Sequence, residues 1–163
     1  MEFAFFISFF IIQRISELFL AKKNESWLRE HGAREYGEKH YPFIVVLHVF
    51  FIACLIVEYI WRPETSFDSI FLLFYFLLLA GKIWTVASLG KYWNTKIFRI
   101  PGSQVVRKGP YKFVRHPNYI IVICEFIVVP LIFHLYYSMV IFSLLNGLML
   151  RVRIREENRV WSN

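Results

Sequence analysis

The chain has 163 residues and a formal net charge of +7, and 57% of its residues are hydrophobic, with a mean hydropathy of +0.46. This apolar content exceeds that of a soluble domain of the same length, so a lipid bilayer is expected to be its main solvent. The positive charge does not indicate nucleic acid, because the basic residues lie between apolar segments, where they suit contact with anionic lipids. A nucleic-acid-binding function is therefore excluded.

Three apolar segments are long enough to cross a membrane. A hydrocarbon core of about 30 Å needs about 20 apolar residues in a helix, and the segments 3–21, 43–61 and 69–89 meet this requirement. The first segment has no basic region before it and no small-residue cleavage site after it, so it is predicted to be a retained span.

A fourth apolar stretch covers residues 118–150 and is interrupted by Pro130 and His134. The interruption predicts two short helices, 118–133 and 135–150, that form a hairpin. The expected fold is therefore an all-α polytopic membrane protein with about five transmembrane helices. Residues 1–163 are expected to form a single membrane-embedded domain.

Basic residues predict the orientation of the chain in a cell membrane. The segments 22–42, 90–117 and 151–163 contain five, seven and four Lys or Arg residues, whereas 62–68 contains only Arg62. Basic segments stay in the cytoplasm, so the N-terminus is expected outside and the C-terminus inside. The first two basic segments are long and supply more polar surface than simple connecting loops require. The functional site is therefore expected at the cytoplasmic face.

Charged residues inside the spans are functional candidates, because burying them in lipid is costly. Arg14 and Glu17 lie one helical turn apart, and they are either functional or a mutually neutralising pair packed against another helix. Glu125 leaves the same two alternatives open, and His48 is either a packed, hydrogen-bonded histidine or a contact of the substrate. Side chains nearer the span ends are expected to extend to the membrane surface instead; these are Glu58 and Lys82.

The string from Gly109 to Tyr119 ends a basic loop and leads into an apolar helix. Gly109-Pro110 indicates a turn, and Pro117 suits the first turn of the following helix. Arg115 and His116 would then lie at a helix N-terminus, which favours an anionic ligand group such as a carboxylate. Taken alone, the pair is equally typical of a basic anchor beside a membrane helix.

The last helix is expected to continue into the cytoplasm through Arg151 to Glu157. Arg153 and Glu157 are four residues apart and so share one helical face. They could form ordinary ion pairs at a solvated helix end. Alternatively, Glu157 and nearby aromatic residues could hold a sulfonium and an α-amino group.

Together these two strings resemble the isoprenylcysteine carboxyl methyltransferase family, whose members have a Gly-x-Tyr turn, an Arg-His-Pro-x-Tyr motif and a C-terminal Arg-x-x-x-Glu. The resemblance implies an S-adenosylmethionine site that Arg153 adjoins on the acceptor side. The implied cofactor contacts are Ser103, Gln104, Val105, Val106, Tyr111, Arg115, His116, Pro117, Asn118, Tyr119 and Glu157. Where this chain has Ser103, the family often has His.

The N-terminal half looks like a bacterial branch of this family encoded with type III polyketide synthases. The resemblance is carried by the segments 13–18, 23–25 and 32–35, and by His40-Tyr41-Pro42 leading to His48. Members of that branch methylate alkylpyrones or related phenolic lipids. The resemblance thus implies a lipophilic small-molecule acceptor and a functional link to such a synthase.

Transfer of a methyl group from a sulfonium removes the positive charge on the sulfur, so the enzyme's main task is to align the reactants and exclude water. A carboxylate or an acidic 4-hydroxy-2-pyrone would need only Arg153 for orientation, whereas a less acidic phenol needs a base, for which His40, His48 and Glu17 are the candidates. Other acceptors remain open, namely the carboxylate of a prenylated cysteine and a lipid amine. A small transporter, a scaffold, or a reductase like the membrane sterol reductases, which have a related C-terminal arrangement, is also consistent with the sequence.

Overall fold

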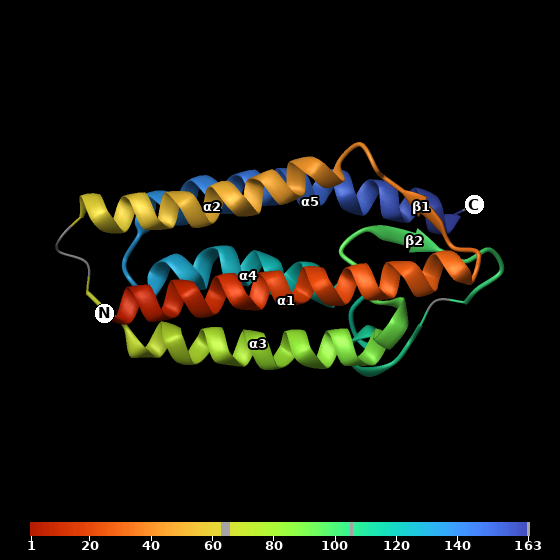
Figure 1. Ribbon diagram of the computed structural model, residues 1–163, viewed down its shortest axis with the longest axis horizontal. Coiled ribbons are helices and arrows are strands. Elements are labelled where there is room, and N and C mark those ends of the chain that lie inside the picture. Colours follow the sequence, from red (N-terminus) through yellow and green to blue (C-terminus); the bar gives the residue numbers. More distant parts are fainter. Residues whose placement is uncertain (63–65, 105, 163) are drawn as a thin grey trace.

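The computed structural model describes residues 1–62, 66–104 and 106–162. Five helices run along a common axis, with the N-terminus at one end and the C-terminus at the other (Figure 1). They are α1 (Glu2–Glu30), α2 (Tyr41–Trp61), α3 (Ser69–Leu89), α4 (Pro117–Leu131) and α5 (Tyr136–Ser162). Two short strands, β1 (Arg34–Tyr36) and β2 (Ile97–Arg99), and two 3-10 turns, η1 (Gly90–Tyr92) and η2 (Gly109–Lys112), lie at the end that holds the C-terminus, which we call the pocket end.

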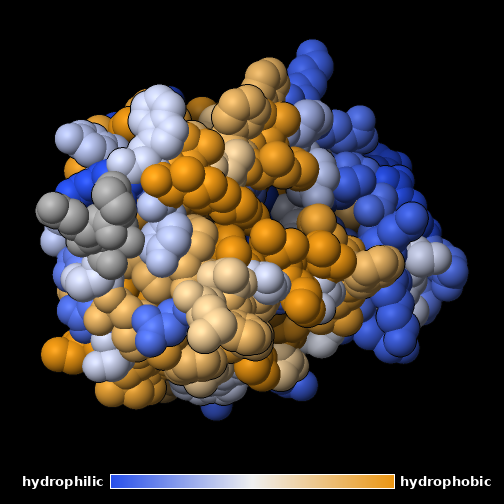
Figure 2. All heavy atoms as spheres, turned by 60° about the vertical axis from the view of Figure 1, so that its left-hand side comes forward, coloured by the Kyte–Doolittle hydropathy of each residue, from blue (hydrophilic) through white to orange (hydrophobic). Residues whose placement is uncertain are grey.

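The outer surface of the helices is suited to lipid. Within the described residues, four helices are long and apolar enough to cross a membrane, and α4 is a shorter apolar helix. Large apolar side chains point outward along the bundle, as Phe5 (76% exposed) and Leu144 (67% exposed) illustrate. Apolar atoms cover much of the face in Figure 2, whereas hydrophilic atoms gather toward the pocket end. The prediction of an all-α polytopic membrane protein is thereby confirmed.

Two helices are longer than the predicted spans. α1 continues nine residues past position 21, to Glu30, and its last turns contain a 2.7 Å ion pair between Glu25 and Arg29. The hairpin between α4 and α5 is present, and its turn contains His134 at a φ of +54°. α5 has 27 residues and runs past the predicted span 135–150, as the expected continuation of the last helix through Glu157 requires. Long runs of residues with high helix propensity carry both helices beyond their apolar segments.

Aromatic side chains fill the centre of the bundle. Phe51 of α2 lies with its ring centroid 4.4 Å from that of Phe126 in α4. Tyr75 of α3 packs edge-on against Phe6 of α1, at 5.1 Å. These contacts join helices distant in sequence, and dispersion between such large side chains stabilises the bundle where lipid gives no hydrophobic driving force.

Four charged side chains meet inside the helical part and form what we call the intramembrane quartet: Arg14, Glu17, Lys82 and Glu125. Arg14 lies 3.1 Å from Glu17 and 2.8 Å from Glu125, and Lys82 lies at the same two distances from these carboxylates. Lys82 is 3% exposed and Glu125 is 0% exposed. The prediction that Lys82 extends to the surface is wrong, because two buried carboxylates neutralise it within the bundle.

Glu58 is also buried, contrary to the prediction that it extends to the membrane surface. Its carboxylate accepts hydrogen bonds from the backbone N–H groups of Tyr137 (3.1 Å) and Ser138 (2.7 Å), at the start of α5. The first turn of a helix has N–H groups without intrahelical partners, and its dipole favours a negative charge. Glu58 therefore caps α5 from a neighbouring helix.

Candidate functional site

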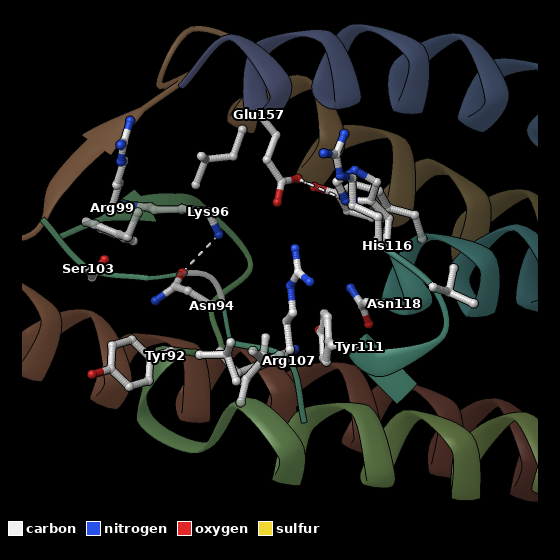
Figure 3. A pocket seen from close by; sticks show the side chains of 18 of the residues that line it. Tyr92, Asn94, Lys96, Arg99, Ser103, Arg107, Tyr111, His116, Asn118 and Glu157 are labelled. Atoms are coloured by element: carbon white, nitrogen blue, oxygen red, sulfur yellow. Dashed lines mark hydrogen bonds and ion pairs between the residues drawn. The ribbon is translucent and has the colours of Figure 1, made fainter. Parts of the chain in front are cut away.

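A cavity of about 450 Å³ opens at the pocket end of the bundle. Its wall combines the loop between α3 and α4, the first turn of α4 and the last turns of α5 (Figure 3). The two sequence motifs that resemble the methyltransferase family therefore lie on the same side of the protein and face one cavity. The residues predicted as site residues that line it are Ser103, Gln104, Val106, Tyr111, Arg115, His116, Asn118, Tyr119, Arg153 and Glu157.

Asparagine side chains attach the cavity loop to α1. The buried Asn24 donates hydrogen bonds to the carbonyls of Gly90 (3.2 Å) and Trp93 (2.7 Å). In the opposite direction, Asn94 donates to the carbonyl of Ala21 at 2.8 Å. These bonds join Gly90, Trp93 and Asn94 to α1, and so they fix where the loop leaves α3.

A second attachment is electrostatic. Lys96, just before β2, lies 3.2 Å from Glu25 of α1 and 3.1 Å from Glu35 of β1. Burial alone would lower the pKa of the Lys96 ammonium, but hydrogen bonds to Glu35 and Glu25 and their negative charges outweigh burial and raise it. Lys96 therefore stays charged at neutral pH and ties the antiparallel β1–β2 pair, in which Glu35 faces Phe98, to α1.

Gly109 sets the position of η2 against α3. Its φ is +53°, a conformation that residues with a Cβ rarely adopt. A Cβ atom at this position would lie 2.0 Å from Ser88 Oγ and 3.1 Å from Trp84 Nε1. Glycine is thus required twice, for the turn and for the close approach that places Tyr111 in the cavity wall.

Three side chains form a hydrogen-bonded line across the cavity wall. The buried Tyr119 donates from its hydroxyl to Glu157 Oε2 at 2.5 Å. Arg153 Nε donates to the same hydroxyl at 2.7 Å, and Arg153 Nη2 donates to the carbonyl of Thr95. The line holds the Glu157 carboxylate in place and connects α5, α4 and the loop before β2.

His116 lies beside Glu157. Its Nδ1 is 3.6 Å from Glu157 Oε2, and its ring stacks on Tyr119 with centroids 5.1 Å apart and an interplanar angle of 14°. The other ring nitrogen, Nε2, is buried and has no hydrogen-bond partner among the described residues. A buried polar atom without a partner costs free energy, so this nitrogen is a candidate ligand contact.

Tyr111 completes this side of the cavity. Burial, together with the negative charge of Glu157, raises the pKa of the Tyr111 phenol well above its ordinary value. The phenol is therefore neutral at physiological pH and can donate a hydrogen bond to a ligand.

Other predicted site residues lie elsewhere. Pro117 is the buried first residue of α4 and is absent from the described lining of the cavity, and Val105 lies outside the described residues. Glu17 belongs to the intramembrane quartet. His48 Nδ1 donates a 2.8 Å hydrogen bond to the carbonyl of Ile44, and the ring packs on Phe126, in the manner of a core histidine.

His40 lies next to the main cavity. It lines a separate small cavity of about 10 Å³, which also contacts Lys96 and Arg153, two residues that line the main cavity as well. His40 Nδ1 is buried without a hydrogen-bond partner among the described residues. Of the three residues considered as a base, His40 is thus the one that lies at the pocket end.

The cavity also contains residues that the sequence motifs did not single out: Asn94, Lys96, Arg99 and Arg107. They all belong to the basic segment 90–117, whose excess of charge was the available signal. Neither periodicity nor a motif distinguishes them from other loop residues.

Comparison with known proteins identifies the relationship. Residues 70–162 match the isoprenylcysteine carboxyl methyltransferase (ICMT) family. A Bacillus subtilis protein described as "Uncharacterized protein YpbQ" is 41% identical over 156 residues, which cover 94% of this chain and 92% of that protein. An "Uncharacterized protein" of Haemophilus influenzae is 29% identical over 154 residues, covering 92% and 89% of the two chains.

No solved structure matches this chain. The family match contains both the Arg-His-Pro-Asn-Tyr string and Glu157, which meet in the cavity described above. The chain therefore belongs to the isoprenylcysteine carboxyl methyltransferase family.

Proposed function

We propose that this protein transfers the methyl group of S-adenosylmethionine to an oxygen atom of a lipophilic acceptor. The observation that carries the proposal is the meeting of His116, Tyr119 and Glu157 in one cavity. Its volume of about 450 Å³ lies within the range of about 300–1,000 Å³ that is usual for small-molecule sites. The supporting relationship is membership of a membrane methyltransferase family.

The residues of the cavity fit the polar groups of this cofactor. Glu157, held by Tyr119, offers a carboxylate to an α-amino group or a sulfonium. His116 Nε2 and the neutral Tyr111 hydroxyl offer further hydrogen bonds. S-adenosylmethionine, when bound, supplies an electrophilic methyl group on a positively charged sulfur.

The chain's own contribution is to align the reactants and keep water out. Arg153 lies beside Tyr119 and lines both cavities, so it can orient an anionic acceptor oxygen next to the cofactor site. The acceptor's alkyl tail would lie between the helices, within the bilayer. This arrangement explains why so small an enzyme is built in a membrane.

The preferred acceptor is an alkylpyrone or a related polyketide lipid, supplied by a type III polyketide synthase. The similarity of the N-terminal half supports this preference, and the basic pocket end suits the acidic enol of a 4-hydroxy-2-pyrone. In the same proposal the pocket end faces the cytoplasm at the cell membrane, and the N-terminus lies outside, since the pocket end carries most of the basic residues. If the acceptor is a less acidic phenol, His40 would serve as the base, because it lines the small cavity together with Arg153.

Membranes that contain the protein, incubated with methyl-labelled S-adenosylmethionine, test the proposal. Glu157→Ala and His116→Ala should abolish labelling of extracted lipids while the protein remains inserted. The matched controls Glu38→Ala and His31→Ala alter exposed residues that line neither cavity and should label normally. Full activity of either cavity variant would refute the site.

The chemical form of the label identifies the acceptor. Alkaline hydrolysis releases methanol from methyl esters but not from methyl ethers or methylated amines. Release of methanol would indicate carboxyl methylation. A label that survives alkali would indicate a methyl ether or a methylated amine, and mass spectrometry of the labelled lipid would distinguish these two products. Calorimetric titration with S-adenosylmethionine separates all these activities from a scaffold, a transporter or a reductase, none of which should bind it.

A further inference from the structure

The cavity contains an arginine to which no role has been assigned. Arg107 extends into the cavity beside Tyr111, between the side that bears Asn94 and Lys96 and the side that bears Asn118 (Figure 3). Its side chain makes no hydrogen bond or ion pair with the residues that the structure describes. A guanidinium has five N–H donors arranged to match an oxyanion, so a ligand can satisfy them.

The other arginines of the cavity wall are already engaged by protein atoms. Arg153 donates to Tyr119 and Thr95, Arg99 donates to the carbonyl of Val160, and Arg115 donates to Asn158 at 3.4 Å. These interactions hold their side chains in the wall. Arg107 differs from these three arginines because its guanidinium faces the cavity and has no hydrogen bond or ion pair with the described residues.

The charge of the cavity points to an anionic ligand. The described lining includes six Lys or Arg residues and a single carboxylate, that of Glu157, and of the six, Lys96 is neutralised by carboxylates behind the wall, those of Glu25 and Glu35. S-adenosylmethionine has two positive groups and one negative group at neutral pH, so such a wall does not match the cofactor alone. A second, anionic ligand beside it would balance the charge.

We propose that Arg107 binds an oxyanion that one of the two reactants supplies, an inference that rests on the proposed function. The chemistry required is a carboxylate or an enolate, which Arg binds in a bidentate manner. Two ligands could supply it, namely the amino-acid carboxylate of the cofactor and the acidic oxygen of the acceptor. The excess of positive charge in the cavity favours the acceptor.

The experiment compares Arg107→Gln and Arg107→Lys with Lys108→Gln, in neutral detergent. Lys108 is exposed, as Arg107 is, but it does not line the cavity, so its variant controls for the general charge of the loop. Calorimetry measures the affinity for S-adenosylmethionine and for decarboxylated S-adenosylmethionine, which lacks the carboxylate. Kinetics measure KM for a 6-alkyl-4-hydroxy-2-pyrone or, if that is not methylated, for total lipid extract.

Loss of a charged hydrogen-bonded contact should weaken binding about tenfold or more in Arg107→Gln, and Arg107→Lys should recover part of the loss. If the acceptor supplies the oxyanion, KM for the acceptor rises while both cofactors bind normally. If the cofactor supplies the oxyanion, S-adenosylmethionine binds more weakly to Arg107→Gln, whereas the affinity for the decarboxylated form is unchanged.

Two outcomes overturn the inference. In the first, Arg107→Gln matches the wild type within about twofold in every measurement. In the second, Arg107→Gln weakens binding of both cofactor forms equally. Wild-type protein that binds no S-adenosylmethionine would instead refute the proposed function and this inference with it. The two failures are therefore distinguishable.

Discussion

The hydroxyl of Tyr119 donates a 2.5 Å hydrogen bond to the carboxylate of Glu157, and so joins the first turn of α4 to the last turns of α5. These residues belong to separate sequence motifs that are 38 positions apart. The bond explains why both motifs are needed for one site, because neither helix alone fixes the position of the carboxylate.

Tyr119→Phe should weaken binding of S-adenosylmethionine about tenfold, because the hydrogen bond to a charged group that orients Glu157 is worth about 1.5–3 kcal/mol. Calorimetry in detergent measures the effect. Tyr92→Phe, which removes the hydroxyl of an exposed cavity residue with no hydrogen bond among the described residues, is the matched control. Unchanged affinity in Tyr119→Phe would contradict the positioning role.

Removing one charge of the intramembrane quartet should destabilise the bundle strongly. Lys82→Met or Glu125→Gln alone should each lower the free energy of unfolding by about 3–5 kcal/mol, because each leaves an unbalanced buried charge. The double variant keeps the neutral pair of Arg14 and Glu17, so its loss should be clearly smaller than the sum. Denaturation in detergent measures all three variants, and additive losses would show that the charges do not act as a unit.

Glu58 should contribute to stability mainly through α5, since its ion pair with the exposed Arg62 is long, at 3.8 Å. Glu58→Ala should lower the free energy of unfolding by about 1–3 kcal/mol, since two backbone N–H groups lose their buried acceptor. Asp68→Ala provides a comparison, because Asp68 accepts one such bond, at 2.8 Å, from Ile70 at the more exposed start of α3. Asp68→Ala should lower the free energy of unfolding by about 1 kcal/mol. An equal or smaller loss in Glu58→Ala would argue against the cap.

Glycine variants can separate backbone strain from close packing in the cavity loop. Gly102 and Gly109 both have positive φ angles, but a Cβ would meet nothing within 4 Å at Gly102 and would meet Ser88 at 2.0 Å at Gly109. Gly102→Ala should cost about 1 kcal/mol from strain alone. Gly109→Ala should cost more and should also weaken cofactor binding, because η2 and Tyr111 must move. Thermal unfolding and calorimetry check both variants, and equal behaviour would contradict the packing argument.

The sequence predicted the helices well because a hydrocarbon core imposes length and apolarity on each span. It located the site through two strings, 109–119 and 153–157, whose residue types identify a family. It predicted that α5 continues past its apolar segment, but it did not predict where α1 ends, since the last turns of α1 depend on ion pairs rather than on apolarity.

Long-range pairings were beyond the reach of the sequence. Lys82 has two carboxylate partners at positions 17 and 125, and nothing in its local pattern distinguishes it from a side chain that extends to the membrane surface. The β1–β2 pair contains three residues per strand, too few for a periodic signal. Arg107 became a candidate only when the cavity showed it to be a lining arginine with no hydrogen bond or ion pair to the described residues.

The bond between Arg14 and Glu125 spans 111 positions, nearly the whole interval between the first helix and the fourth. During synthesis, Arg14 and Lys82 must therefore enter the membrane with only Glu17 to offset them until α4 emerges. A chain truncated before position 125 keeps an excess positive charge at the depth of the quartet. Charge balance inside the bundle is therefore reached only when the fourth helix is in place.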